Sequence, residues 1–347
     1  MAIIATERPG IYSSYEASKI IWGTGNGKKV GIVCSSTVQG GQVYNMTRLS
    51  DVSLIFGNNS LMYRLCEIAF NNGASEIAGL SAGDETIDYK SAFDLLKNEN
   101  DIGIVICDSE DTQVHELLKD SILEASNNLK ERIGIVSCSK DEDVTTWSEN
   151  YNCERLVLVA QSPLDDNGNV LTSCLIAAAL AGVISKNVDP SISFNDSQLN
   201  GINSLDKNLT EDEIDIYIKN GITPFEVTVG KVEAIRVVTS KTNTDGVMDK
   251  TFKDLNTILV MDYVISGVRN VLDKYLYGTK NNSVTRKSIA TQTTIQLEEY
   301  RSSGIIDYYE SPMVAIDSDD PSICIVEIQF TISHALNQIQ ILANIKV

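Results

Sequence analysis

The chain has 347 residues, 43% of them hydrophobic, which is enough to bury a substantial core and to form more than one domain. Its 28 basic and 47 acidic side chains give a formal charge of −19 at pH 7. An electric field of that sign repels nucleic acid and anionic membrane surfaces, so neither is expected as a partner.

The seven cysteines are scattered and form no C-x-x-C pair, so neither a disulfide framework nor a structural metal site is expected, and a reducing compartment is. The first residues lack the charged segment, apolar block and cleavage site of a secretion signal. The longest apolar run, residues 170–184, is too short to span a bilayer and is predicted to be a buried helix. We therefore expect no direct insertion into a membrane.

The first 22 residues are typical of an extended strand. In ERPGIYSSYEAS, residues 7–18, Ile11, Tyr12 and Tyr15 stand among small polar residues. The following GTGNGKK, residues 23–29, matches neither of the glycine-rich phosphate-binding patterns, and it precedes its strand instead of following one. It is predicted to be a linker.

From residue 29 onward, short β-branched runs alternate with segments of helical period, and the runs are KKVGIVCSS, SEIAGLSA, DIGIVICDS, ERIGIVSCS and ERLVLVAQS. Two apolar helical faces lie between them: Leu61, Met62, Leu65, Ile68 and Ala69, and Val114, Leu117, Leu118, Ile122, Ala125 and Leu129. Apolar strands separated by such helices predict a mainly parallel sheet covered on both faces. We expect an α/β domain over residues 23–185, doubly wound from about residue 28.

The second half of the chain has a different pattern. Polar residues 186–221 are predicted to be a linker or surface excursion, and an α+β domain is expected over 222–334. It contains a strand-like FEVTVGKVEAIRVVTS, a helix over about 284–303, a strand CIVEIQFTI, and a long helix whose apolar positions are Leu255, Ile258, Leu259, Ile265, Val268, Leu272 and Leu276.

The last residues mirror the first. In QIQILANIKV the apolar positions Ile339, Ile341, Ala343, Ile345 and Val347 alternate with their neighbours, which predicts a strand that runs to the last residue. Nine residues at about 3.3 Å each reach roughly 30 Å, far enough to pair outside the parent domain. The predicted fold is therefore α/β plus α+β, with an extended strand arm at each end.

Charge is divided unevenly along the chain. Residues 84–166 hold 20 acidic and seven basic side chains, whereas residues 263–304 hold six basic and three acidic ones, a net of +3. The basic residues of interest in the second region are Lys274, Lys280, Arg286, Lys287 and Arg301. The ordinary interpretation of each is a solvated helix face.

GLSAG at residues 79–83 matches the nucleophile-elbow pattern, which makes Ser81 a candidate hydrolase nucleophile. An elbow needs a helix directly behind the serine, but here Asp84 or Thr86 is the expected N-cap of a helix over 87–97. A glycine-rich strand-to-helix turn is the preferred interpretation.

Other polar groups also favour structural roles. The two histidines, His115 and His334, are not placed as triad bases by the sequence. Two groups of carboxylates open predicted helices, where capping is favoured over a metal site: Asp108, Glu110 and Asp111, and Asp141, Glu142 and Asp143. No catalytic, cofactor-binding or metal-binding residue is therefore proposed from the sequence.

Seven stretches follow one another along the chain: RPG-I-Y, VGIVCSSTVQGGQVYNMTRLSDVSLIFG, AFNNGASEI, ITPFEV, GKVEAIRVVTS, YLYGTKNN and QIQILANIKV. In this order they resemble the contractile tail sheath proteins of bacteriophages and phage-tail-like bacteriocins. Two positions differ from many relatives: Gly40, Gly41 and Gln42 replace a Gly-Pro turn, and Ala74 replaces a second glycine. At this length the chain is similar to the compact sheaths of phages and defective prophages of Gram-positive bacteria.

This resemblance implies a structural subunit that polymerises helically around an inner tail tube and contracts to drive the tube through a bacterial envelope. It implies an outward-facing, subtilisin-like α/β domain and a core sheath domain, 222–334, that faces the tube. The arms, 1–22 and 335–347, would each add a strand to a sheet of a neighbouring subunit. The basic residues Lys274, Lys280, Arg286, Lys287 and Arg301 would suit contact with an acidic tube.

The implied partners are further copies of the chain, the tail tube protein, and the baseplate and tail terminator proteins. The implied location is a virion tail or phage-tail-like particle assembled in the host cytoplasm. Two alternatives stay open. A cytosolic α/β enzyme would need a convergent catalytic set at the ends of its parallel strands. Another self-assembling protein, such as a surface-layer or tube subunit, is the third hypothesis.

Overall fold

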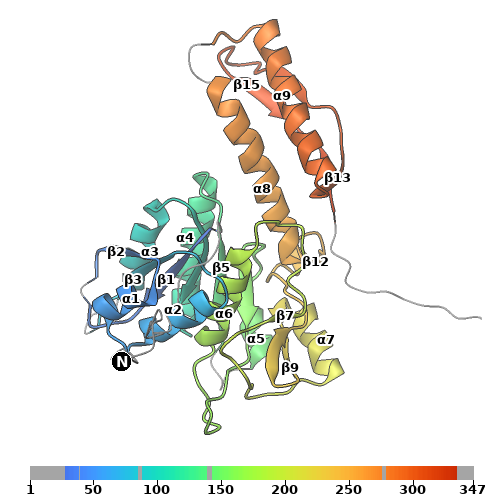
Figure 1. Ribbon diagram of the computed structural model, residues 1–347. Coiled ribbons are helices and arrows are strands. Elements are labelled where there is room, and N and C mark those ends of the chain that lie inside the picture. The colour runs from blue at the N-terminus through green and yellow to red at the C-terminus, as the bar shows by residue number, and fades with distance from the viewer. Residues whose placement is uncertain (1–27, 39, 85–87, 139–142, 276–278, 334–347) are drawn as a thin grey trace, which may run out of the picture.

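The structure is a computed structural model, and it describes residues 28–38, 40–84, 88–138, 143–275 and 279–333. Figure 1 shows an α/β body and a long helical arm that projects from it. All residues predicted to form the two terminal arms lie outside the described residues, as do Thr86, Asp141, Glu142 and His334.

A seven-stranded sheet forms the centre of the body, in the order β2-β3-β1-β4-β5-β6-β8. Its strands are β1 Lys29–Cys34, β2 Val43–Met46, β3 Ile77–Ser81, β4 Ile102–Cys107, β5 Ile133–Ser137, β6 Leu156–Val159 and β8 Ile222–Thr223. Only β2 pairs antiparallel to its neighbour, and every residue of β3 to β6 is buried. The predicted mainly parallel sheet is therefore confirmed.

Helices cover both faces of this sheet. One face is packed by α1 Leu49–Phe56, α2 Leu61–Asn71 and α6 Cys174–Lys186. The other is packed by α3 Tyr89–Asn98, α4 Thr112–Asn127, α5 Val144–Ser148 and α7 Glu211–Lys219. Helix α6 is buried along nearly its whole length, as its apolar sequence predicts. Leu129 does not lie on the apolar face expected of it: it follows α4 with a φ of 63° and is 61% exposed.

Residues 186–221, expected as a linker or surface excursion, are packed into the body. Phe194, Leu199, Ile202 and Leu205 are buried in the same core as α6, and Tyr217 of α7 is buried on the opposite face. The short strand β7 Ser197–Gln198 pairs with β10 Lys231–Ala234. These five apolar residues supply core contacts, whereas Val188, Ile192 and Ile216 of the same segment are exposed.

The predicted strand FEVTVGKVEAIRVVTS is a hairpin. Its strands are β9 Phe225–Thr228 and β10, joined by Val229 and Gly230. A second hairpin follows, with β11 Asn243–Thr244 and β12 Val247–Met248 joined by Asp245 and Gly246.

The arm consists of α8 Leu255–Leu272, the 3₁₀ turn Asp273–Tyr275 and α9 Ser283–Ser302, which runs back along α8 (Figure 1). Both long helices were predicted. Leu255 and Ile258 lie in the body core, whereas Val260, Val264 and Val268 pack with Leu297 and Tyr300 in a separate arm core. Thus α8 belongs to both parts. Ile265, expected on the apolar face, is 38% exposed.

Two small antiparallel sheets complete the arm. Strand β13 Ile306–Tyr309 pairs with β16 Phe330–Ile332, and β14 Met313–Ile316 pairs with β15 Cys324–Glu327. The run CIVEIQFTI, predicted as one strand, is therefore divided between two sheets. Over the described part of the chain, no helix is long and apolar enough to cross a membrane.

Candidate functional site

Ser81, the candidate nucleophile, is a buried structural hydroxyl. It is 2% exposed, donates to the Val38 carbonyl oxygen at 2.6 Å and accepts from Ser36 Oγ at 2.9 Å. The N-cap of α3 is Asp88, whose carboxylate accepts from the Ser91 N–H, so the expected caps Asp84 and Thr86 were wrong. Among the described residues, the first helix after Ser81 is α3, which starts at Tyr89, and the Ser81 hydroxyl stabilises a turn.

His115 is buried, and the hydrogen-bond partners of its two ring nitrogens do not include Ser81. Its Nδ1 lies 2.8 Å from Tyr151 Oη and its Nε2 lies 2.8 Å from the Ser109 carbonyl oxygen. Burial lowers the pKa of His115, which keeps the ring neutral at pH 7. Because both ring nitrogens are engaged, His115 has no free position from which to serve as a general base.

The carboxylates near the carboxyl ends of the strands have separate structural roles. Asp111 and Asp143 cap α4 and α5, as predicted. Asp108 does not open a helix: it accepts from the Ser35 N–H at 3.0 Å and from Tyr89 Oη at 2.8 Å. Glu110 accepts from Ser173 Oγ at 2.9 Å, at the start of α6. Within the described ranges, no group of three or more His, Cys, Asp or Glu could hold a metal ion.

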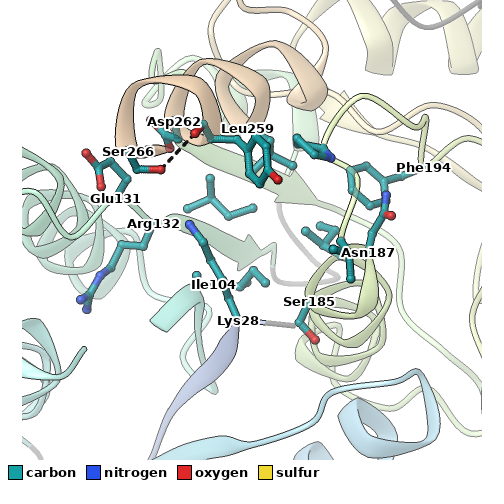
Figure 2. Close-up of a pocket in the computed structure, with 16 residues that line it drawn as sticks. Lys28, Ile104, Glu131, Arg132, Ser185, Asn187, Phe194, Leu259, Asp262 and Ser266 are labelled. Carbon is teal, nitrogen blue, oxygen red and sulfur yellow. Dashed lines mark hydrogen bonds between the residues drawn. The ribbon is translucent and has the colours of Figure 1, made fainter. Parts of the chain in front are cut away.

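A cavity of about 200 Å³ lies where α8 leaves the body (Figure 2). Its walls include Ile104 and Glu131 near the starts of β4 and β5, Asn187 after α6, and Leu259 and Asp262 of α8. Open α/β sheets bind small molecules at the carboxyl ends of their strands, whereas this cavity is at the amino ends. Its place indicates a joint between body and arm.

Two ion pairs fasten α8 to the body at this joint. Arg155, next to β6, contacts Asp262 through both guanidinium nitrogens, at 2.6 and 2.7 Å. The two side chains are only 10% and 7% exposed, and burial raises the pKa of Asp262 although Arg155 opposes the rise. About two turns farther along α8, Arg269 contacts Glu131 at 2.6 Å. Neither pair was predicted; the available signal was Asp262 inside the apolar run ILVMDYVI.

The five basic residues proposed to face a tube do not form one patch. Lys274, Lys280, Arg286 and Lys287 lie around the turn between α8 and α9, at the end of the arm farthest from the body (Figure 1). Arg301 is 15 residues beyond Arg286 on α9, about 22 Å along the helix axis. There it pairs with Glu298.

An acidic loop accompanies the four basic residues at the arm tip. Asn281 donates to the carbonyl oxygens of Pro321 and Ile323, at 2.9 and 3.1 Å. These contacts bring the loop that contains Asp317, Asp319 and Asp320 beside the basic residues. The net charge of +3 on residues 263–304 is therefore offset locally by acidic side chains that are distant in the sequence.

The arm presents open strand edges. Each of its two sheets has two strands, and no other strand of the described chain pairs with them. Tyr308, Met313 and Ile325 are 59%, 63% and 46% exposed on these strands. An isolated two-stranded sheet is marginally stable, and its unpaired N–H and C=O groups are a template for a further strand.

The fold and these surfaces define a structural class of protein, an α/β body joined to an arm with free strand edges, and no described cluster resembles a catalytic set. The family model of the phage tail sheath protein central domain matches residues 82–242, and that of the phage tail sheath C-terminal domain matches residues 247–346. Together they span about three quarters of the chain. The chain belongs to the phage tail sheath family and is a structural subunit of a contractile sheath; the enzyme alternative is not supported.

Solved structures share this fold at low sequence identity. A sheath tail protein of Listeria innocua has a TM-score of 0.74 at 12% identity, covering 91% of this chain and 94% of its own. One from Desulfitobacterium hafniense has a TM-score of 0.70 at 11% identity, covering 93% and 100%. The anti-feeding prophage helical sheath in its contracted state has a TM-score of 0.73 at 14% identity, covering 99% and 100%. Comparison with curated protein sequences gives no match.

Proposed function

We propose that this chain polymerises as stacked rings around an inner tail tube and that contraction of the polymer drives the tube through a bacterial envelope. The observation that carries the proposal is the match of both sheath domain models, in order, to residues 82–242 and 247–346. The similar anti-feeding prophage chains come from a helical sheath and from a baseplate, which supports self-association and contact with a baseplate. The tail tube and tail terminator proteins are further proposed partners.

The proposed links between subunits are the arms 1–22 and 335–347, each adding a strand to the β13–β16 sheet of a neighbour. This sheet is a suitable acceptor because its two outer edges have no partner among the described residues. It also lies next to the point where residues 334–347 begin. At about 0.5–1.5 kcal/mol for each hydrogen bond, a joint of roughly four to eight bonds contributes several kcal/mol.

Contraction in this proposal rearranges subunits as rigid bodies. Helix α8 packs in the cores of both body and arm, and the Arg155–Asp262 pair fastens it to the body. These connections support movement of body and arm as one unit. The energy would be stored in contacts between subunits during assembly, as in other bistable packings, and no hydrolysis is required. We propose a non-enzymatic protein, assembled in the host cytoplasm into a virion tail or phage-tail-like particle, with the subtilisin-like kinship and outward position of the body as further proposals.

The arm-tip residues Lys274, Lys280, Arg286 and Lys287 are proposed to contact the tube, together with Arg301. Charge pairs there would be weak and screened by salt, so they could break when the lattice expands. The acidic loop at 317–320 modifies this proposal: the matching tube surface would carry both signs of charge instead of being uniformly acidic.

The proposal that the terminal arms link subunits is tested by negative-stain electron microscopy. The full-length chain and a variant lacking residues 336–347 are compared over a concentration series. Ile341→Pro, which removes a ladder donor from the predicted strand, and Ile341→Val, which preserves it, are the matched pair. We expect hollow striated cylinders from the full-length chain and Ile341→Val, and monomers from the other two. Cylinders from all four would contradict the C-terminal link, and cylinders from none would contradict self-assembly.

A further inference from the structure

The β9–β10 hairpin has an unfavourable residue at its tip. Thr228 pairs with Lys231, so the loop consists of Val229 and Gly230 alone, with φ angles of 51° and 74°. Two successive positive φ values are the pattern of a type I′ turn, whose first central position prefers Asn, Asp or Gly. Valine is poorly suited to that position because its branched Cβ crowds the backbone when φ is positive.

The same chain contains a matched turn with a favourable residue. The β11–β12 hairpin is also closed by two residues, Asp245 and Gly246, with φ angles of 52° and 77°. Asp-Gly is among the preferred sequences for this turn. The two hairpins differ in that one accepts a conformational penalty to place an isopropyl group at its tip.

That isopropyl group contributes nothing to the subunit's own core. Val229 is 97% exposed, more than any other large apolar side chain in the described ranges, and Val227 beside it is 37% exposed. A single exposed valine on a strand is ordinary. A fully exposed valine in a backbone conformation that disfavours it calls for a contact outside the subunit.

The hairpin also carries a charge arrangement that an outside cation would stabilise. Glu226 and Glu233 are directly opposite each other across the two strands, where like charges destabilise a sheet. Glu233 accepts from Gln198 Nε2 at 2.9 Å, whereas Glu226 is exposed and has no hydrogen bond or ion pair within the described chain. A lysine or arginine on another molecule would neutralise this pair.

We infer that the hairpin Phe225–Ala234 docks onto a second copy of this chain, with Val229 entering an apolar hollow and a basic side chain meeting Glu226. This inference rests on the proposed function, in which further copies of the chain are its direct neighbours in the polymer. The hairpin lies at the opposite end of the molecule from the arm tip (Figure 1), so it is remote from the proposed tube contact.

The consequence is a directional contact. A hairpin that meets a different surface of the next copy makes a heterologous interface, which propagates into an open helical polymer instead of closing a dimer. The hairpin contact would act in addition to the strands exchanged through the terminal arms.

The discriminating variant is Val229→Asn, since asparagine suits the turn but removes the apolar group. We expect it to raise the unfolding midpoint by about 1–3 °C while raising the critical concentration for polymerisation, measured by sedimentation, about tenfold or more. Val229→Ile preserves the apolar group, and Asp245→Asn makes a favourable change in the matched turn. Both should polymerise like the unmodified chain.

Three other outcomes would each contradict a different part of this inference. If the unmodified chain polymerises and Val229→Asn polymerises equally well, the hairpin does not dock onto a second copy, and the sheath proposal is unaffected. If Val229→Asn polymerises normally but loses binding to a tube or baseplate protein, a second copy is the wrong partner. If the unmodified chain never polymerises, the proposed self-assembly fails, and the second-copy contact fails with it.

Discussion

Arg155 and Asp262 are the residues that most directly connect the two parts of the molecule. Their two contacts of 2.6 and 2.7 Å join the start of β6 to the middle of α8, at a site almost without solvent. Replacing such a buried pair by apolar residues is often neutral, whereas removing one partner leaves a buried charge uncompensated. The main effect of the pair is therefore to fix the position of α8 on the body, and its net contribution to stability is small.

We predict that Asp262→Asn lowers the free energy of unfolding by about 3 kcal/mol or more, because Arg155 keeps its charge without a counter-ion. Asp215→Asn is the control: Asp215 and Lys219 form a pair with side chains 71% and 69% exposed, for which we expect a loss below about 0.5 kcal/mol. Urea unfolding measures both. Equal effects of the two substitutions would show that the buried pair is not a restraint on α8.

His115 gives the folding stability of the protein a predictable dependence on pH. Its pKa is lowered by burial in the folded protein, so below the ordinary value near 6.5 the unfolded chain binds the proton more strongly. The contribution of neutral His115 to the free energy of unfolding is therefore complete above about pH 6.5. It decreases as the pH falls toward the pKa of His115 in the folded protein, by at most about 1.4 kcal/mol per pH unit.

The measurement is the unfolding midpoint of the unmodified chain and of His115→Gln between pH 7.5 and 5. This window lies above the range in which most carboxylates titrate. We expect a decline in the unmodified chain that is flatter in His115→Gln, whose stability is lower at pH 7.5. Parallel curves for the two proteins would contradict the assignment of the decline to His115.

At the scale of elements, the contact between α2 and α6 depends on Gly182. A Cβ at this position would lie 2.4 Å from the Ala69 carbonyl oxygen and 2.8 Å from Asn72 Cβ. Both distances are below van der Waals contact, and one of the obstructing atoms belongs to the backbone of α2. The two helices therefore approach each other as closely as glycine allows.

Gly182→Ala should consequently destabilise the protein by about 1–3 kcal/mol, although alanine is the better helix former. Thr291→Ala, at an exposed position of α9, tests propensity without a clash and should leave stability unchanged or slightly higher. Thermal unfolding distinguishes the two. A Gly182→Ala variant at least as stable as the parent would mean that α2 and α6 can separate without loss.

The elements that could be predicted are those whose pattern reflects burial. Strands β3 to β6 are buried throughout and almost entirely apolar because both faces of the sheet are covered. Helices α8 and α9 keep helical spacing because each has a packed side. The core contribution of residues 186–221 could not be predicted, because five isolated apolar residues give the sequence no hydrophobic period. The division of CIVEIQFTI between two sheets depends on pairing partners that its own sequence does not identify.

The same limit applies to the candidate sites. Ser81 could be rejected as a nucleophile from the spacing behind it, although the capping residue proved to be Asp88. The Arg155–Asp262 pair joins residues 107 positions apart, and only an aspartate within an apolar helix hinted at it. The roles of the terminal-arm residues, from Ile11 to Tyr15 and from Ile339 to Val347, remain predictions because these residues lie outside the described part of the chain.

On the scale of the whole molecule, two surfaces with different properties are held in a fixed relation. The body carries most of the negative charge, while the arm carries the free strand edges and a tip of mixed charge. Asn281 brings the loop that contains Asp317, Asp319 and Asp320 beside the basic residues of the tip only in the folded arm, so a count along residues 263–304 alone does not show the mixed charge there. The shared helix α8 makes arm and body suitable to move together.

The most direct test of the account is a cryo-electron microscopy reconstruction of cylinders assembled from the full-length chain. We predict a helical lattice in which strands from neighbouring subunits lie beside β13 and β16, continuing that sheet. Cylinders in which both edges of β13–β16 are bare, or are covered only by the same chain, would contradict it.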